Sequence, residues 1–354
     1  MITKLEIENF RGIRKIDFNE FKQINVFVGK NNSGKTTILE SIFLNIGAIN
    51  PELAPRLNSF RQHNKVDDSS LRALFYNFDI TNPIKITANV KNPKQFRELT
   101  ITPNQTKGNQ KKIVNIIDIE SHENTSLNTK EIVGLDSNLM FKESSKGNAK
   151  SFKSSIQKTP RGLEITQPTN YVEKIRGIFI NPRTTVQDNA TRLSKIKLKK
   201  EEDQIIEILR KIEPKLKKIE ILENNYIYAD IGKENLIPFN LLGDGINRLL
   251  SIILAIFENK NGVVLIDEIE NGFHYQALET LWKAVINIAK IHNVQIFATT
   301  HSWENIHAFA KVFSDLNYKD LTLHRIESSD EINRGVVYND ELLLQTLESE
   351  WELR

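Results

Sequence analysis

The stretch GKNNSGKT, residues 29–36, decides the fold of this chain. It fits the pattern G-x-x-x-x-G-K-[ST] at every fixed position. Its glycines let the backbone wrap closely, so that successive N–H groups and a helix N-terminus face an anion. The apolar run INVFV, residues 24–28, precedes the stretch, and the helically spaced run TILESIFLNI, residues 37–46, follows it. The order of strand, glycine loop and helix predicts a phosphate-binding loop.

The side chains of this loop have distinct expected tasks. Lys35 supplies a positive charge for the β- and γ-phosphates of a nucleotide, and the Thr36 hydroxyl is suited to ligating Mg²⁺. A chance glycine-rich turn is the alternative, and the flanking strand and helix argue against it. The expected nucleotide-binding residues are Gly29, Asn31, Asn32, Ser33, Gly34, Lys35, Thr36 and Thr37.

Two acids follow a second apolar strand, GVVLIDE, residues 262–268. Ligands of a doubly wound sheet bind at the carboxyl ends of its strands, where Asp267 and Glu268 would lie. We expect Asp267 to hold Mg²⁺, usually through water. Glu268 is suited to accepting a proton from the attacking water. The alternative is a surface turn with solvated acids, and the presence of a phosphate loop favours the site.

A third apolar strand, VQIFATTH, ends at His301. A histidine at this position can contact the γ-phosphate and orient the water through its ring N–H. A capping or buried structural histidine is the alternative. The expected catalytic residues are therefore Glu268, His301 and Lys35, and the expected metal ligands are Thr36 and Asp267.

Composition limits the class of protein. The chain has 354 residues, enough for a large α/β domain with insertions or for two lobes around a cleft. It contains no cysteine, which excludes disulfides, a catalytic thiol and zinc sites of the cysteine type. The N-terminal MITKLEIENF carries charges where a signal peptide would be apolar, so we expect a cytoplasmic protein without a membrane segment. A net charge of +3 is too small to indicate nucleic-acid binding by itself.

The rest of the chain shows several patterns. Short strand-like pieces between Ile84 and Phe141 predict an antiparallel β wing, and the stretch 121–158, rich in Ser, Asn and Lys, predicts a mobile insertion. Strands that alternate with helices predict a mostly parallel sheet. A helical lobe is predicted from an apolar stripe, with Pro214 expected to break or kink the helix. The stripe comprises Ile205, Ile206, Leu209, Ile212, Leu216 and Ile219.

Taken in order, NFRGI, GKNNSGKT, LGDGINR, VVLIDEIENGFH and IFATTH resemble the ABC-type ATPases. The resemblance is to the cytosolic branch that contains SMC and Rad-type repair ATPases and the ATPase parts of OLD (overcoming lysogenisation defect) nucleases. It implies an α/β ATPase head with a mixed, mostly parallel sheet, an antiparallel wing and a helical second lobe. It also implies a division into residues 1–180 (lobe I, first part), 181–260 (helical lobe II with a signature loop) and 261–354 (lobe I, second part).

The resemblance implies a homodimer or higher oligomer, because in that family a signature loop completes the ATP site of another subunit. The pattern of this branch resembles L-S-D-G-x-x-R, and Leu242, Asp244, Gly245 and Arg248 match it. Gly243 replaces the serine, which removes a hydroxyl expected at the γ-phosphate. Backbone N–H groups of Gly243 and Gly245 would have to contact the phosphate instead.

Three further positions are implied less directly. The family often carries a glutamine where the chain enters the helical lobe, and Asn181 and Gln187 lie in that region. Arg11 resembles a basic residue that approaches the nucleotide, with a solvated surface arginine as the alternative. The stretch IENGFHYQ resembles the loop that couples the two sites of a dimer, so Glu270 and His274 would either touch a partner subunit or lie on the surface.

These features together imply an ATPase that uses ATP and Mg²⁺. OLD nucleases carry a TOPRIM domain with a D-x-D pair, and no such pair follows His301. The expected effector would then be a separate protein, for example a TOPRIM-type nuclease. Two-gene anti-phage defence systems have this arrangement. One alternative is a DNA repair or recombination ATPase, because residues 192–218 hold ten Lys or Arg against five Asp or Glu. The interspersed acids also fit a solvated helix face. A slowly hydrolysing, nucleotide-gated scaffold is the other alternative, given the missing serine and glutamine.

Overall fold

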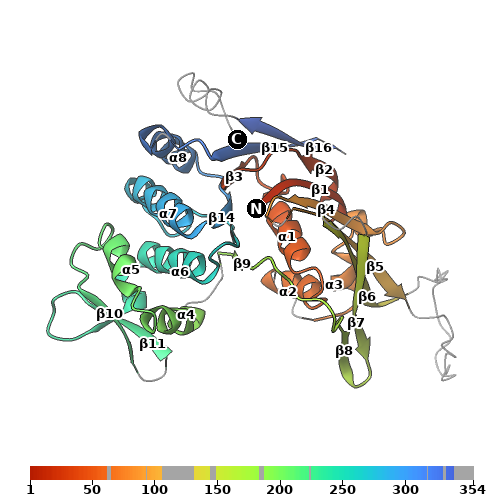
Figure 1. Ribbon diagram of the computed structural model, residues 1–354, viewed down its shortest axis with the longest axis horizontal. Coiled ribbons are helices and arrows are strands. Elements are labelled where there is room, and N and C mark those ends of the chain that lie inside the picture. The colour runs from red at the N-terminus through yellow and green to blue at the C-terminus, as the bar shows by residue number, and fades with distance from the viewer. Residues whose placement is uncertain are drawn as a thin grey trace, which may run out of the picture.

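The computed structural model describes residues 1–61, 65–92, 94–105, 131–143, 149–182, 187–222, 225–316, 318–329 and 332–338. Two large β-sheets lie side by side, with helices between them and on the outer face of one sheet (Figure 1). Within these ranges no helix is long and apolar enough to span a membrane.

The central sheet carries the strands that precede the predicted site residues. Its spatial order is β16 (Ile332–Tyr338), β15 (Leu321–Ser329), β3 (Ile24–Val28), β14 (Gln295–Thr299), β13 (Val263–Ile266) and β9 (Gly177–Ile180). All neighbours are parallel except β15 and β16. The carboxyl ends of β3, β9, β13 and β14 therefore meet at one edge, as ligand sites of such sheets require.

The two faces of the central sheet pack against different layers. Ile24, Val26 and Val28 of β3 pack towards a helical layer, while Phe27 packs towards the second sheet. This alternation follows from the two-residue period of a strand. The helical layer comprises α4 (Gln187–Lys197), α5 (Glu202–Leu209), α6 (Asp244–Glu258), α7 (Leu278–His292) and α8 (Trp303–Leu316), with the short η4 (Tyr275–Ala277) before α7.

The second sheet is the predicted antiparallel wing. Its order is β2 (Ile13–Phe18), β1 (Ile2–Phe10), β4 (Ile84–Val90), β5 (Gln95–Gln105), β6 (Ile132–Glu143), β7 (Ala149–Thr159) and β8 (Gly162–Thr166). Helix α1 (Lys35–Ile46) lies between the two sheets, beside α2 (Leu53–Phe60), and α3 (Asp68–Arg72) contacts α2 (Figure 1). The short η1 (Tyr76–Phe78) follows α3 in the chain. The helix that follows the phosphate loop is thus enclosed by apolar side chains from both sheets.

A buried arginine connects α1 to the wing. Arg97 of β5 is 1% exposed, and its Nη2 donates to the carbonyl oxygen of Asn45 at 2.8 Å. The same guanidinium forms an ion pair with Glu173 at 2.7 Å. A charge this deeply buried is stable only with such partners, so the end of α1 is held against the wing.

The predicted mobile insertion at 121–158 is wrong for the part that the structure describes. Residues 132–143 form β6, and residues 149–159 form β7. Residues 121–130 and 144–148 of the insertion lie outside the described residues. Leu135 and Leu139 of β6 and Ile156 of β7 are buried on one face. Ser137 and Ser154 are buried on the same face, and most other polar residues of the two strands lie on the opposite face, so the sequence resembled an unstructured segment.

The helical part of the predicted lobe is shorter than expected, because a small sheet lies within the lobe. Helix α5 ends at Leu209, so Pro214 is not in a helix, and Ile219 belongs to β10. Leu216 and Ile219 are buried all the same, in the core beneath the helices. The small sheet consists of β10 (Lys218–Leu222), β11 (Tyr226–Asp230) and β12 (Ile237–Pro238), followed by η3 (Phe239–Leu242).

The expected fold class is confirmed: a mixed α/β architecture with a mostly parallel sheet, an antiparallel wing and a helical region. The division at residues 180 and 260 stays a prediction. Its first and third parts share the central sheet, because β9 pairs with β13.

Candidate nucleotide-binding site

The phosphate loop leaves the central strand β3 at Gly29 and enters α1 at Lys35. Gly29 has a φ of 147°, and a Cβ there would lie 2.6 Å from the carbonyl oxygen of Ile326. Gly34 has a φ of 97° and caps α1. Both positions therefore require glycine, and the N-terminus of α1 opens at the carboxyl edge of the sheet.

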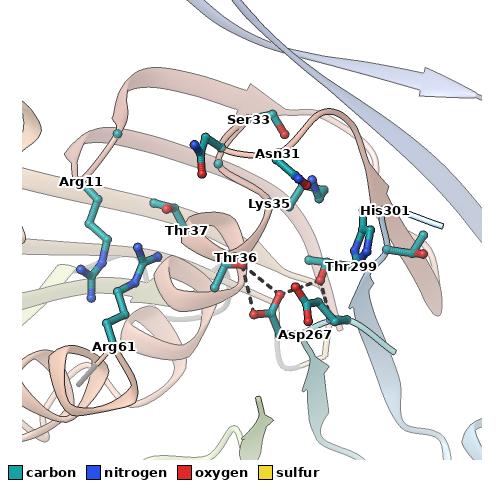
Figure 2. Close-up of a pocket in the computed structure, with 15 residues that line it drawn as sticks. Arg11, Asn31, Ser33, Lys35, Thr36, Thr37, Arg61, Asp267, Thr299 and His301 are labelled. Atoms are coloured by element: carbon teal, nitrogen blue, oxygen red, sulfur yellow. Dashed lines mark hydrogen bonds between the residues drawn. The ribbon is translucent and has the colours of Figure 1, made fainter. Parts of the chain in front are cut away.

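Asp267 is held by two hydroxyl groups from different segments. Thr36 Oγ1 donates to its carboxylate at 3.0 and 3.1 Å, and Thr299 Oγ1 donates to Oδ1 at 2.6 Å (Figure 2). The residue is 7% exposed. Three side chains from α1, β13 and β14 thus converge on one point.

These oxygens fit a divalent cation. Hydroxyl and carboxylate oxygens are the ligands that Mg²⁺ prefers, and it usually keeps several waters beside one or two protein ligands. Within the described residues no group of three or more His, Cys, Asp or Glu is placed to hold a metal ion. The expected pair Thr36 and Asp267 is therefore brought together with suitable chemistry.

Glu268 follows Asp267 with an unusual backbone. Its φ is 49°, in the left-handed region that residues with a side chain seldom adopt. Its N–H donates to Thr299 Oγ1 at 2.8 Å, which holds this conformation. Such conformations cost about 1–3 kcal/mol and persist where the surroundings impose them. The turn directs Glu268 and Asp267 differently, and both line the same cavity.

Lys35 lies within the loop. Its Nζ donates to the carbonyl oxygens of Gly29 and Lys30, each at 2.8 Å. Burial lowers the pKa of Lys35, and the nearby carboxylates, Asp267 foremost, offset part of that shift. An ammonium group bound only to carbonyls would gain from a phosphate anion at the same place.

The site residues line one cavity of about 650 Å³. Figure 2 shows side chains of the phosphate loop on one side and Asp267, Thr299 and His301 on the other. The lining residues are Arg11, Gly12, Asn31, Asn32, Ser33, Gly34, Lys35, Thr36, Thr37, Arg61, Asp267, Glu268, Thr299, Thr300 and His301. Except for Gly29, every residue predicted for the phosphate loop lies in this lining.

Arg11 lies at the cavity in an ion pair. Its Nε is 2.7 Å from Glu40 Oε2, and the Glu40 side chain is 1% exposed. Arg61 contacts the same carboxylate at 3.0 Å. Burial lowers the pKa of Arg11 to about 10, although Glu40 opposes that change. Arg11 is therefore not a solvated surface residue, and Arg61 joins it at the cavity.

Arg61 and Thr299 line the site but were not predicted from the sequence. Arg61 follows α2 in a segment without a recognisable pattern, so no signal pointed to it. Thr299 ends the buried strand β14, as many threonines do, and nothing in the sequence distinguishes it from Thr300. Their place in the site is visible only in three dimensions.

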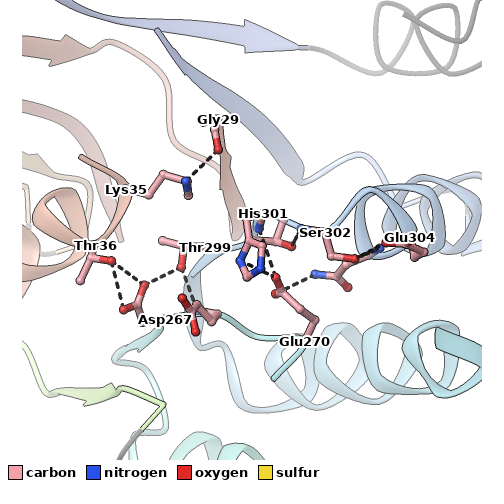
Figure 3. Close-up of polar contacts among 12 residues, drawn as sticks. Gly29, Lys35, Thr36, Asp267, Glu270, Thr299, His301, Ser302 and Glu304 are labelled. Atoms are coloured by element: carbon pink, nitrogen blue, oxygen red, sulfur yellow. Dashed lines mark hydrogen bonds and ion pairs between the residues drawn. The ribbon is translucent and has the colours of Figure 1, made fainter. Parts of the chain in front are cut away.

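His301 contacts Glu270 at the edge of the cavity. Its Nδ1 lies 3.3 Å from Glu270 Oε1, and its side chain is 52% exposed. Its backbone N–H donates to the same oxygen at 3.1 Å. Glu270, which the sequence placed either at a partner subunit or on the surface, instead supports a residue of its own chain (Figure 3).

The signature loop does not face the cavity of its own chain. Gly243, Asp244 and Gly245 begin α6 and are absent from the cavity lining. A Cβ at Gly245 would lie 2.9 Å from the carbonyl oxygen of Gly272. The loop therefore packs against the segment that follows the two acids.

Arg248 differs from the other signature residues, because its side chain turns inward. Nη1 donates to the carbonyl oxygen of Asn181 and Nη2 to that of Asp267, each at 2.7 Å. Burial lowers the pKa of Arg248 to about 10. In this structure the guanidinium joins α6 to the ends of β9 and β13. A role of Arg248 on another subunit stays a prediction.

The two positions considered for the missing glutamine lie in different elements of the fold. Asn181 directly follows β9 and is 8% exposed, and its carbonyl accepts from Arg248. Gln187 is the first residue of α4, and its side chain lies outside the described residues. Asn181 does not belong to the described cavity lining.

A phosphate loop on a parallel strand, two acids at the end of another and a histidine at the end of a third define a P-loop ATPase with an ABC-type head. The chain belongs to the AAA ATPase domain family, whose model matches residues 1–306. It is therefore an ATPase.

Two relatives and one solved structure agree with this class. The chain is 24% identical to the ATP/GTP phosphatase of Helicobacter pylori, with 100% of both sequences covered. It is 25% identical to the OLD nuclease of Thermus scotoductus over 94% of this chain, and it spans 63% of that protein. The SMC head bound to the C-winged helix domain of ScpA has the same fold, with a TM-score of 0.51 at 11% identity over 97% of this chain and 99% of that one.

Proposed function

We propose that two copies of this ATPase enclose ATP between them and thereby control a separately encoded effector, a nuclease, in defence against phage. The observation that carries the dimer is the position of the signature loop. Gly243 and Asp244 are exposed and lie outside the cavity of their own chain, at the N-terminus of α6. A helix N-terminus favours a phosphate anion, which a second copy would supply.

In this proposal the cavity binds the nucleotide in one subunit. Backbone N–H groups of the loop and the Lys35 ammonium bind the β- and γ-phosphates. Thr36 and Asp267 hold Mg²⁺, which neutralises charge on the phosphates. Glu268 accepts a proton from the attacking water, and His301 contacts that water or the γ-phosphate. Arg11 and Arg61 lie at the far side of the cavity, where they would meet the rest of the nucleotide.

Exposed apolar side chains beside the signature loop support a second copy as its partner. Leu241 is 70% exposed directly before the loop, and Tyr275 is 60% exposed after the neighbouring segment that contains Gly272. The fully buried centre of a protein interface is more apolar than the rest of the surface and is enriched in aromatic residues such as Tyr. Gly243 has no hydroxyl, so its N–H would contact the phosphate, and we expect slower hydrolysis than with a serine.

The role in defence rests on likeness to one relative. The chain is 25% identical to an OLD nuclease and spans 63% of it, and the effector that we propose is a separate nuclease. This step is an analogy of family and not of geometry. Co-purification from the native operon, with and without ATP, tests it by mass spectrometry: a nuclease that joins the complex supports the proposal, and recovery of this chain alone contradicts it.

A role on DNA is the second candidate, favoured by one observation. Lys211, Lys215, Lys217 and Lys218 are exposed around the end of α5 and the start of β10. Lys195 and Lys197, by contrast, form ion pairs with Glu258 and Glu220. Salt-dependent binding of duplex DNA that weakens when these four lysines are replaced would support this candidate.

The dimer is tested in a variant that retains ATP. Glu268→Gln should slow hydrolysis by about 10²–10⁴-fold, as expected for loss of a general base. With ATP and Mg²⁺ this variant should elute as a dimer in size-exclusion chromatography with light scattering. Adding Leu241→Glu should restore the monomer, while nucleotide binding persists.

The matched control is Leu222→Glu, which places the same charge on an apolar residue of β10 that is 46% exposed. It should leave the dimer intact. Gly245→Val is a second disrupting variant, although it also displaces Gly272 within its own chain. A dimer that survives Leu241→Glu and Gly245→Val would show that the signature loop does not form the contact.

A further inference from the structure

Glu270 is a buried acid at the edge of the site that the reaction described above does not use. Its side chain is 11% exposed, and it does not line the nucleotide cavity. Oε1 accepts the backbone N–H of His301 at 3.1 Å and lies 3.3 Å from His301 Nδ1. Figure 3 shows the carboxylate between His301 and the start of α8.

The other oxygen of Glu270 connects to the interior. Asn305 Nδ2 donates to Oε2 at 3.4 Å, and Trp282 Nε1 donates to Asn305 Oδ1 at 2.8 Å. Asn305 and Trp282 are 0% exposed, on α8 and α7. A carboxylate that is this enclosed needs donors on both oxygens. The donor to Oε1 is the backbone N–H of His301, and the donor to Oε2, Asn305, is a fully buried residue of α8. Glu270 therefore has little freedom to turn away from His301.

This contact distinguishes the two nitrogens of the His301 ring. A carboxylate oxygen accepts hydrogen bonds and does not donate them, so a ring nitrogen beside it carries a proton. That nitrogen is Nδ1, and the remaining nitrogen, Nε2, is left for a group in the cavity that His301 lines. The polar partner of one ring nitrogen favours the state of the other.

We propose that Glu270 is a positioning residue for ATP hydrolysis, which acts by fixing the orientation and the tautomer of His301. In the neutral ring Nε2 then carries no hydrogen and accepts a hydrogen bond from the attacking water. Glu268 remains the proton acceptor, and Glu270 touches neither water nor nucleotide. The inference rests on the proposed role of His301, and it replaces the expected ring N–H with a ring acceptor.

The tautomer is measured directly by two-bond ¹H–¹⁵N NMR spectra of ¹⁵N-histidine-labelled protein without nucleotide. The His301 signals are those that disappear in His301→Gln. We expect a proton on Nδ1 in the wild type. Glu270→Ala should shift the neutral ring towards protonation at Nε2, whereas Glu270→Gln keeps an oxygen that can accept and should retain the Nδ1 proton.

The same variants give the kinetic readout. Glu270→Ala should lower kcat about tenfold or more, as for loss of a residue that orients a functional histidine, with the KM for ATP changed less than about twofold. Glu270→Gln should restore most of kcat. Glu304→Ala is the matched control. Glu304 is another acid close to His301 in the sequence, at the start of α8, but its carboxylate accepts a hydrogen bond from Ser302 Oγ. This variant should leave both readouts unchanged.

Three outcomes would overturn the proposal: unchanged His301 signals in Glu270→Ala, a changed tautomer with unchanged kcat, or equal loss of kcat in the Ala and Gln variants. The spectra require no ATP and no dimer. The contact is thus tested even if the two-copy arrangement fails, and the Leu241→Glu experiment tests that arrangement without involving Glu270.

Discussion

At the scale of single residues, Thr299 connects the two acids of the site. Its one hydroxyl donates to Asp267 Oδ1 at 2.6 Å and accepts the Glu268 N–H at 2.8 Å. The first contact orients the proposed metal ligand, and the second holds the strained turn of the proposed base. Since both contacts depend on one oxygen atom, the orientation of the two carboxylates is coupled.

Replacement of that oxygen should therefore impair hydrolysis. Thr299→Val keeps the shape of the side chain but removes its hydroxyl. The Glu268 N–H then has no acceptor there, and the Asp267 carboxylate loses one donor. A hydrogen bond to a charged group such as this carboxylate contributes about 1.5–3 kcal/mol. We expect kcat to fall by about 10–100-fold, with a smaller effect on ATP affinity. Steady-state phosphate release measures the first and titration of a fluorescent ATP analogue the second.

Thr299→Ser is the control, because it retains the hydroxyl and should retain most activity. Wild-type turnover in Thr299→Val would mean that the backbone alone positions Glu268.

The residues of the site were predictable to different degrees. Lys35, Thr36, Asp267 and His301 lie in short patterns next to apolar strands, and parallel strands bring their carboxyl ends together without further information. Thr299 and Arg61 have no such local signal. The inward turn of the Arg248 side chain depends on where β9 and β13 lie relative to α6, which a loop pattern does not encode.

At the scale of elements, α6 connects two regions of the molecule. It begins with the exposed Gly243–Asp244 segment, and further along Arg248 donates to the carbonyls that end β9 and β13. A displacement of the signature loop along α6 would therefore reach the backbone of Asp267. The helix is 15 residues long and mostly buried.

Arg248→Lys tests this connection. Lysine has one ammonium group and lacks the planar fork that reaches both carbonyls, so one carbonyl loses its donor. We expect ATPase activity to fall about tenfold, since an unsatisfied buried polar group costs about 1–3 kcal/mol and the end of β13 would shift. Hydrolysis rate and thermal unfolding are measured together.

Arg210→Lys is the matched control. Arg210 also donates to two backbone carbonyls, those of Leu216 and Lys217, at 2.7 and 3.0 Å. It lies at the end of α5 and not at the site, so its replacement should affect stability alone. Equal loss of activity in both variants would remove the special role of Arg248.

The elements themselves were predicted where periodicity was clear. β1 buries Leu5 and Ile7 on one face where its sequence alternates, and β3, β13 and β14 are buried throughout. β6 and β7 were missed because their exposed face is rich in Ser, Asn and Lys. β10 was taken for helix because Leu216 and Ile219 continue the apolar spacing of α5, although the chain turns before them.

At the scale of the whole molecule, a buried histidine makes stability depend on pH. His324 of β15 is 0% exposed and lies 5.2–5.5 Å from the rings of Phe18, Phe21 and Phe27. Burial lowers the pKa of His324 to about 3. The unfolded chain, with a pKa of about 6.5, binds a proton that the folded protein excludes, so stability falls as pH decreases below about 6.5.

Between pH 7 and pH 5 this group should cost about 2 kcal/mol of the free energy of unfolding. Urea titrations at the two pH values measure the difference for the wild type. In His324→Gln the difference should be smaller by that amount, even if the variant is less stable at both pH values. His307→Gln, at an exposed position of α8, is the matched control. An undiminished difference in His324→Gln would assign the pH dependence to other groups.

The position of β3 also bears on how the protein is made. Its two neighbours are β14 and β15, and the nearby Ile2 N–H bonds Gln295 Oε1 across 293 residues. The wing strands β4 and β5 pair with close neighbours in the chain and can assemble early during synthesis. β3 pairs only after β14 and β15 have been synthesised, because contacts between distant segments form late. A ribosome that has not yet translated β14 therefore carries a phosphate loop on an unpaired strand, and a nascent chain of that length should not retain nucleotide.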